Sequence, residues 1–97
     1  MNQGEAKAVL AGQVRELQKR PYAEFRSWVI EKTIETPLVK GSSGTEYQVE
    51  IQALWDGKRG GTIRVFVSVD DGRLLSSFLP LCGSFVVSPD ASLEGRR

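Results

Sequence analysis

The sequence predicts an α+β domain in which one or two N-terminal helices pack on a four-stranded, or with a C-terminal strand five-stranded, antiparallel meander sheet. Hydrophobic residues recur at helical spacing up to about residue 29 and alternate with polar residues from Thr33 onward. Glycine-rich turns separate the alternating segments, which is typical of antiparallel strands. The 97 residues, 40% of them hydrophobic, suffice for one small core. We therefore expect a single domain over residues 1–97, with helices at about 4–29, the sheet at about 33–88 and a mobile tail at about 92–97.

Two helices are expected before residue 30. The first has an apolar face with spacings of four, four and three residues, made by Ala6, Leu10, Val14 and Leu17. Asn2 and Glu5 have the spacing of a capping box at its start. Pro21 cannot continue this helix but suits the first turn of another. The second helix then has an aromatic stripe that we assign to the core, made by Tyr22, Phe25, Trp28 and Val29.

The strands follow from alternation and turns. The segment "TIETPLV" predicts a first strand, and Pro37 favours a position at the edge of the sheet. After the turn "KGSSG", residues 46–55 and 63–69 each alternate with one apolar face. The residues "DDG" at 70–72 predict a three-residue hairpin into a fourth strand. A short C-terminal strand or hairpin is expected around "FVVSPDASL".

The loop between the two long strands determines which side chains share a face. Odd-numbered apolar residues of both strands can lie together only if the loop has an odd length. The six residues of "DGKRGG" therefore require that Gly61 joins the third strand or that Thr62 joins the loop, unless a bulge corrects the register. In both cases Leu54 and Phe66 lie on the outer, mostly polar face. The "DDG" hairpin adds Leu74 and Phe78, whereas a two-residue loop would replace them with Leu75 and Leu79.

This outer apolar set suggests how the protein acts. The candidate protein interface consists of Leu54, Phe66, Leu74 and Phe78. One interpretation is that the C-terminal segment folds back and buries the set with Phe85, Val86 and Val87. The other is that an exposed apolar patch marks protein contact, with a homodimer or with another protein partner. We expect a small non-catalytic domain that acts through such contact.

An alternative function is weak binding of nucleic acid or an anionic ligand. The basic loop at 57–61 presents Lys58 and Arg59, and Arg64 lies nearby on the outer face. The net charge of +1 supplies no strong attractive field, and Glu46 and Glu50 share the face of Arg64. Nucleic acid is therefore not expected as the main partner, and binding of this type should weaken steeply as salt rises.

Catalysis is not expected, because the chain contains no histidine and therefore lacks the commonest general base and zinc ligand. Cys82, the single cysteine, is assigned as a buried, inert thiol. No cofactor or metal site is predicted. An enzyme would require a substrate pocket between helices and sheet around Trp28, Tyr47 and Trp55. Short apolar runs predict no membrane segment, and one cysteine without an export signal favours the cytoplasm.

Overall fold

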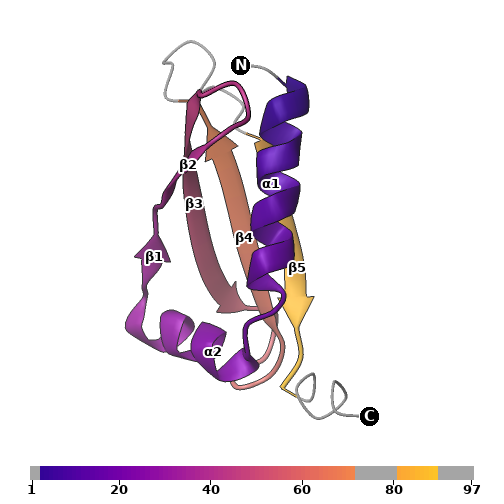
Figure 1. Ribbon diagram of the computed structural model, residues 1–97. Helices are drawn as coiled ribbons and strands as arrows, with labels where there is room; N and C mark the ends of the chain where they lie inside the picture. The colour runs from indigo at the N-terminus through magenta and orange to yellow at the C-terminus, as the bar shows by residue number, and fades with distance from the viewer. Residues whose placement is uncertain (1–2, 72–80, 90–97) are drawn as a thin grey trace.

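The computed structural model describes residues 3–71 and 81–89 and contains two helices packed on a five-stranded antiparallel sheet (Figure 1). This confirms the predicted α+β class. The strands are β1 (Ile34–Glu35), β2 (Leu38–Lys40), β3 (Glu46–Trp55), β4 (Ile63–Asp70) and β5 (Leu81–Val87). The order across the sheet is β1-β3-β4-β5, and β2 pairs with β3 on the same edge as β1. From β2 onward consecutive strands are therefore neighbours, as a meander requires, and β1 continues the edge next to β3.

Both helices cover one face of this sheet, which we call the inner face. Helix α1 (Gln3–Leu17) lies along β4 and β5, and helix α2 (Tyr22–Glu31) lies against β3 and β4 (Figure 1). The predicted faces are the ones that pack: Ala6 and Leu17 of α1 and Phe25 and Trp28 of α2 are buried. No described helix is long and apolar enough to cross a membrane.

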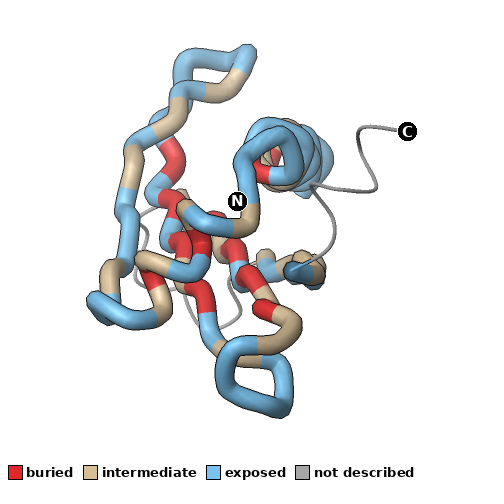
Figure 2. Tube along the Cα trace, turned by 90° about the horizontal axis from the view of Figure 1, so that it is seen from below, coloured by how far each residue is buried: buried red, intermediate tan, exposed pale blue. Residues whose placement is uncertain are grey.

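The core lies between the helices and the odd-numbered residues of the long strands. In Figure 2 the buried stretches of chain lie on the strands and on the helices that cover them. Phe25 is central, because its ring packs edge to face with Trp28 at a centroid distance of 5.3 Å and with Phe85 of β5 at 6.0 Å. The strand residues buried on this face are Tyr47, Val49, Ile51, Ala53, Ile63, Val65, Val67 and Val69.

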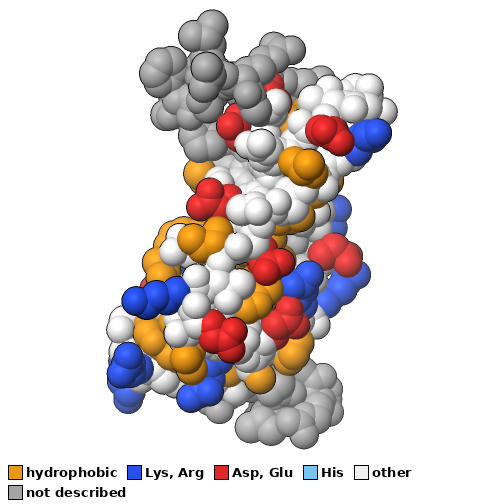
Figure 3. All heavy atoms as spheres, turned by 90° about the vertical axis from the view of Figure 1, so that its left-hand side faces the viewer, with side chains coloured by type: hydrophobic (Ala, Val, Ile, Leu, Met, Phe, Trp, Pro, Cys, Tyr) orange, Lys and Arg blue, Asp and Glu red, His pale blue; other side chains and the backbone are white. Residues whose placement is uncertain are grey.

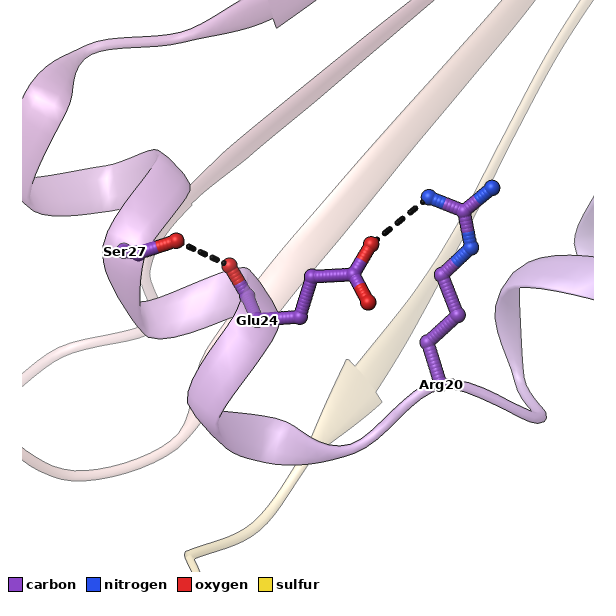
Figure 4. A network of polar contacts seen from close by, with 3 residues as sticks. All are labelled: Arg20, Glu24 and Ser27. Carbon is purple, nitrogen blue, oxygen red and sulfur yellow. Dashed lines mark hydrogen bonds and ion pairs between the residues drawn. The ribbon is translucent and has the colours of Figure 1, made fainter.

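Arg20 stabilises the connection between the two helices. Its guanidinium donates to the Glu24 carboxylate at 2.8 Å and lies over the Trp28 ring, 5.6 Å from the centroid. The Ser27 hydroxyl donates to the Glu24 carbonyl at 2.8 Å, so the first turn of α2 and the preceding turn form one polar network (Figure 4). Helix α2 ends at Lys32, whose left-handed backbone (φ 57°, ψ 41°) lets the last carbonyls accept hydrogen bonds.

The predicted first strand is interrupted. The two segments β1 and β2 are separated at Thr36 and Pro37, because proline has no N–H to donate to the sheet. The Pro37 carbonyl still accepts a hydrogen bond from the Val49 amide at 3.0 Å. The expectation of one continuous strand is therefore wrong, but its edge position is confirmed.

The loop between β3 and β4 takes one of the two predicted forms. Trp55 is the register partner of Ile63, and the Asp56 amide donates to the Thr62 carbonyl at 2.8 Å. Thr62 therefore joins the loop, the loop length is odd, and the apolar residues of both strands share the inner face.

The predicted three-residue hairpin at 70–72 is wrong. Strand β4 extends to Asp70, and its second neighbour is β5, with Val69 opposite Leu81. The connection therefore covers residues 71–80, most of which lie outside the described part of the chain. The tail expected at 92–97 also lies outside it. The turn residues alone predict a local hairpin. Strand β4 pairs instead with β5, because the apolar alternation of β5 matches the inner face.

Candidate functional site

The outer face of the sheet carries the even-numbered residues of the long strands, including Leu54 and Phe66. Cross-strand register places Gln52, Phe66 and Ser84 in one row, with Ile34 at its β1 end. The adjacent row consists of Leu54, Arg64 and Val86. Because antiparallel register partners point to the same face, these two rows form a continuous surface.

Four large apolar side chains in these rows are exposed, and we call them the outer apolar patch. Their exposed fractions are 48% for Ile34, 45% for Leu54, 42% for Phe66 and 50% for Val86. Leu38 of β2 lies on the same face, opposite Gln48, and is 63% exposed. The side of the molecule that carries β1 and β2 shows hydrophobic surface interrupted by charged groups (Figure 3).

The C-terminal strand does not fold back over this patch. The interpretation that Phe85, Val86 and Val87 bury it is therefore wrong. Strand β5 extends the plane of the sheet beside β4, with Phe85 opposite Val65 and Val87 opposite Ile63 on the inner face. Val86 points to the outer face and enlarges the patch. The other two predicted members, Leu74 and Phe78, lie outside the described residues.

The other end of the outer face is acidic. A hollow of about 420 Å³ is lined by Thr36, Leu38, Gln48, Glu50, Ser68 and Asp70. Oδ1 of Asp70 is buried and has no hydrogen-bond partner within the described chain. Glu46 lies one register step beyond, opposite Lys40. A bound group with hydrogen-bond donors or positive charge would satisfy the carboxylates of this end.

Arg64, predicted as an anion contact, is already paired. Its Nε lies 3.2 Å from Oδ1 of Asp56, and its Nη1 donates to the Ser84 hydroxyl at 3.1 Å. The Asp56 carboxylate therefore compensates the positive charge of Arg64, which lies between Leu54 and Val86. Arg64 is therefore not grouped with the other two predicted anion contacts.

Lys58 and Arg59 lie in the β3–β4 loop, as expected. Arg59 lines a hollow next to α2 together with Arg26 and Lys32, two residues that the sequence did not single out. Both belong to the helical segment, so only the folding of the hairpin against α2 brings them to Arg59. No local spacing in the sequence could have indicated this cluster.

Glu5 of α1 is a polar anchor that the sequence assigned only to capping. Its carboxylate accepts hydrogen bonds from the Tyr47 hydroxyl at 2.6 Å and from the Ser43 amide and hydroxyl at 2.6 and 2.8 Å. The Ser42 hydroxyl donates at 3.1 Å. These contacts, led by Tyr47, lower the pKa of Glu5 from 4.5 to about 2, because each stabilises the ionised carboxylate. The Asn2 half of the predicted capping box lies outside the described residues.

The structure also locates Cys82 and the aromatic residues of the predicted substrate pocket. Cys82 is exposed rather than buried, because its position in β5, opposite Ser68, faces outward. Of the aromatic residues proposed to line a substrate pocket, Trp28 and Tyr47 are packed in the core and Trp55 is partly buried. Trp55 lines the hollow beside Arg59 instead.

Comparison with known proteins found no match to this chain. No protein-family model matches the chain, and neither the curated proteins nor the solved structures include a significant match to it.

Proposed function

We propose that the chain is a non-catalytic domain that binds another protein on the outer face of its sheet. The observation that carries this proposal is the outer apolar patch, in which four large side chains on one strand surface are 42–50% exposed. Contiguous exposed apolar surface of this kind is typical of protein contact sites. A non-catalytic role is further supported by the absence of histidine from the sequence.

The chemistry of the face indicates what the partner presents. The patch lies at one end, and the hollow with Glu50 and Asp70 lies at the other. Arg64 carries a positive charge on this face but is paired with Asp56. A complementary partner segment therefore combines large apolar side chains with Lys or Arg a few residues away.

A second copy of the chain fits the full face less well. A two-fold axis parallel to the strands would stack one acidic end on the other, and like charges in contact oppose association. An axis perpendicular to the strands would place each acidic end on the partner's apolar patch, which desolvates Glu50 and Asp70 without pairing them. The two ends of the face therefore favour a different protein over self-association.

The first test is mass in solution by light scattering over a hundredfold concentration range. The native chain and Phe66→Glu should both be folded monomers, because under this proposal the patch binds a different protein and not a second copy of the chain. A native dimer that Phe66→Glu separates into folded monomers would overturn the partner assignment and place a second copy on the face.

The second test selects binders from a displayed library of random twelve-residue peptides. Enriched peptides should combine aromatic or large aliphatic residues with Lys or Arg. Phe66→Ser should weaken their binding about tenfold, because central apolar contacts dominate interface energies. Glu50→Gln should weaken it about two- to fivefold at low salt.

Ile30→Ser is the matched control for this selection. Ile30 is 55% exposed but belongs to α2, so its replacement removes a similar side chain from elsewhere on the surface. Equal losses with Ile30→Ser and Phe66→Ser, enrichment of acidic peptides whose binding Phe66→Ser weakens, or no enrichment at all would each overturn the proposal.

A further inference from the structure

A second site candidate lies on the α2 side of the molecule, away from the outer face. A hollow of about 400 Å³ opens between the C-terminal half of α2 and the β3–β4 loop. Basic side chains line it from three segments: Arg26 from the helix, Lys32 from its end and Arg59 from the loop. Its apolar lining comes from Val29, Ile30 and Trp55, and no acidic side chain contributes to it. Basic groups gather beside hydrophobic surface at the lower left of Figure 3, at the α2 end of the molecule.

The positive charge of this hollow is not neutralised within the described chain. Among the described residues, Arg26, Lys32 and Arg59 make no ion pair, whereas nearby bases do. Lys19 pairs with Glu16 at 2.9 Å and Arg20 pairs with Glu24 at 2.8 Å. Three converging cations without a counter-charge attract an anion more strongly than isolated surface bases do.

The segments that carry these cations are held in place. The Tyr22 hydroxyl donates to the Gly61 carbonyl at 2.6 Å, which ties the β3–β4 loop to the start of α2. Within the loop, the Asp56 and Gly61 amides donate to the carbonyls of Thr62 and Lys58 at 2.8 and 3.0 Å. Arg59 is therefore presented from a closed loop. This reduces the entropy lost when a ligand binds.

Lys32 occupies a backbone conformation that favours glycine. It is the only described non-glycine residue with positive φ, at 57°, at the position where helices most often place glycine. A lysine there costs conformational energy that glycine would avoid.

The C-terminal end of α2 opposes anion binding only in part. A helix C-terminus carries roughly half a negative charge, concentrated on its free carbonyls. Two of these carbonyls, on Trp28 and Val29, already accept hydrogen bonds from the amides of Thr33 and Lys32. Three full positive charges outweigh the remaining partial charge.

We propose that this hollow binds a small organic anion that combines a phosphate or carboxylate group with a flat apolar portion. The cations hold the anionic group, and the flat portion lies on Trp55 and Ile30. The volume is within the range of about 300–1,000 Å³ that is typical of small-molecule sites. A nucleic-acid polymer is less suitable, because a net charge of +1 and one local cluster provide no extended basic track.

The test is an NMR titration of the full chain with three probes: adenosine 5′-monophosphate, inorganic phosphate and adenosine. The monophosphate should shift the Trp55 indole signal and the amide signals of residues 26, 29–32 and 58–60. Phosphate and adenosine should each bind more weakly, since each lacks one of the two recognised parts. Equal binding of adenosine, no saturable shift, or shifts spread over all basic residues would overturn the proposal.

Variants separate a binding role from a structural one. Arg26→Gln and Arg59→Gln should each weaken monophosphate binding about two- to fivefold, and Arg15→Gln, in an exposed part of α1, should leave it unchanged. Lys32→Gly should raise the Tm, because glycine relieves the left-handed backbone, and should also weaken binding about two- to fivefold. A Lys32→Gly protein that is more stable and binds as tightly as the native chain would exclude Lys32 from the site.

Discussion

The two faces of the sheet are built from the same strands but differ in what covers them. On the inner face of β4, Ile63, Val65, Val67 and Val69 are each no more than 1% exposed. On the outer face of the same strand, Phe66 is 42% exposed. The helices of the chain close the inner face, whereas within the described residues no helix lies on the outer one. The difference indicates that apolar residues of the inner face serve stability, and the exposure of those on the outer face supports the proposal that they contact a partner.

The largest expected effect comes from removing one phenylalanine from each face. Phe25→Ala should destabilise the fold by about 3–5 kcal/mol, because it leaves a cavity between Trp28 and Phe85. Phe66→Ala should cost about 1 kcal/mol, because the ring is already partly in water. Urea unfolding followed by circular dichroism measures both values. Equal losses would mean that the two faces contribute alike to stability and that the outer face is a second core.

The inner face could be predicted from the sequence, because the patterns that indicate it involve residues close together in the chain. Helical spacing in α1 and alternation in β3 and β4 depend on residues close together in the chain, and the structure has both. The parity of the β3–β4 loop also predicts that Leu54 and Phe66 lie on the outer face, and the register confirms it. By contrast, the "DDG" turn suggested a hairpin that is not formed, because β4 pairs with a strand that begins only at Leu81.

The two proposed binding sites could not be predicted from the sequence in full, because they depend on residues that are far apart in the chain. Val86 joins the outer apolar patch only through the pairing of β5 with β4, and Ile34 only through the pairing of β1 with β3. The cluster of Arg26, Lys32 and Arg59 requires the β3–β4 loop to pack beside α2. A pattern of residue types along the chain carries no information about such convergence until the strand register is known.

Glu5→Gln should weaken the attachment of the N-terminal end of α1 to the sheet on the inner face. The pKa of Glu5 is about 2 in the folded chain and near its ordinary value of 4.5 when unfolded. Its ionised form therefore stabilises the fold fully above about pH 4.5, and this contribution is lost as the pH falls toward 2. The variant should have a lower Tm at neutral pH, and its Tm should depend less on pH between about 2 and 4.5.

Ser43→Ala provides a graded companion to this experiment. It removes the hydroxyl that donates to Glu5 at 2.8 Å but keeps the amide that donates at 2.6 Å. Its Tm at pH 7 should therefore lie between those of the native chain and Glu5→Gln. If Glu5→Gln followed the native Tm at every pH, the anchor would contribute nothing to stability.

Tyr22→Phe tests the contact that holds the β3–β4 loop against α2. The change removes only the hydroxyl that donates to the Gly61 carbonyl, so the expected loss is about 1 kcal/mol. Amide hydrogen exchange should become faster at Gly61, whose N–H donates to Lys58 within the loop, and should be unchanged in the middle of β4. Faster exchange throughout β4 would show instead that the hydroxyl supports the whole inner layer.

Arg64→Gln should give the smallest effect, because its contacts lie on the outer face. Arg64 and Asp56 have side chains that are 39% and 40% exposed, and an exposed ion pair contributes about 0.5 kcal/mol or less. The free energy of unfolding in urea should therefore fall by no more than this, and added salt should reduce even that difference. A loss above about 1.5 kcal/mol would exceed what an exposed pair supplies. In that case the outer face would stabilise the fold through its polar contacts, and the division of roles between the two faces would no longer hold.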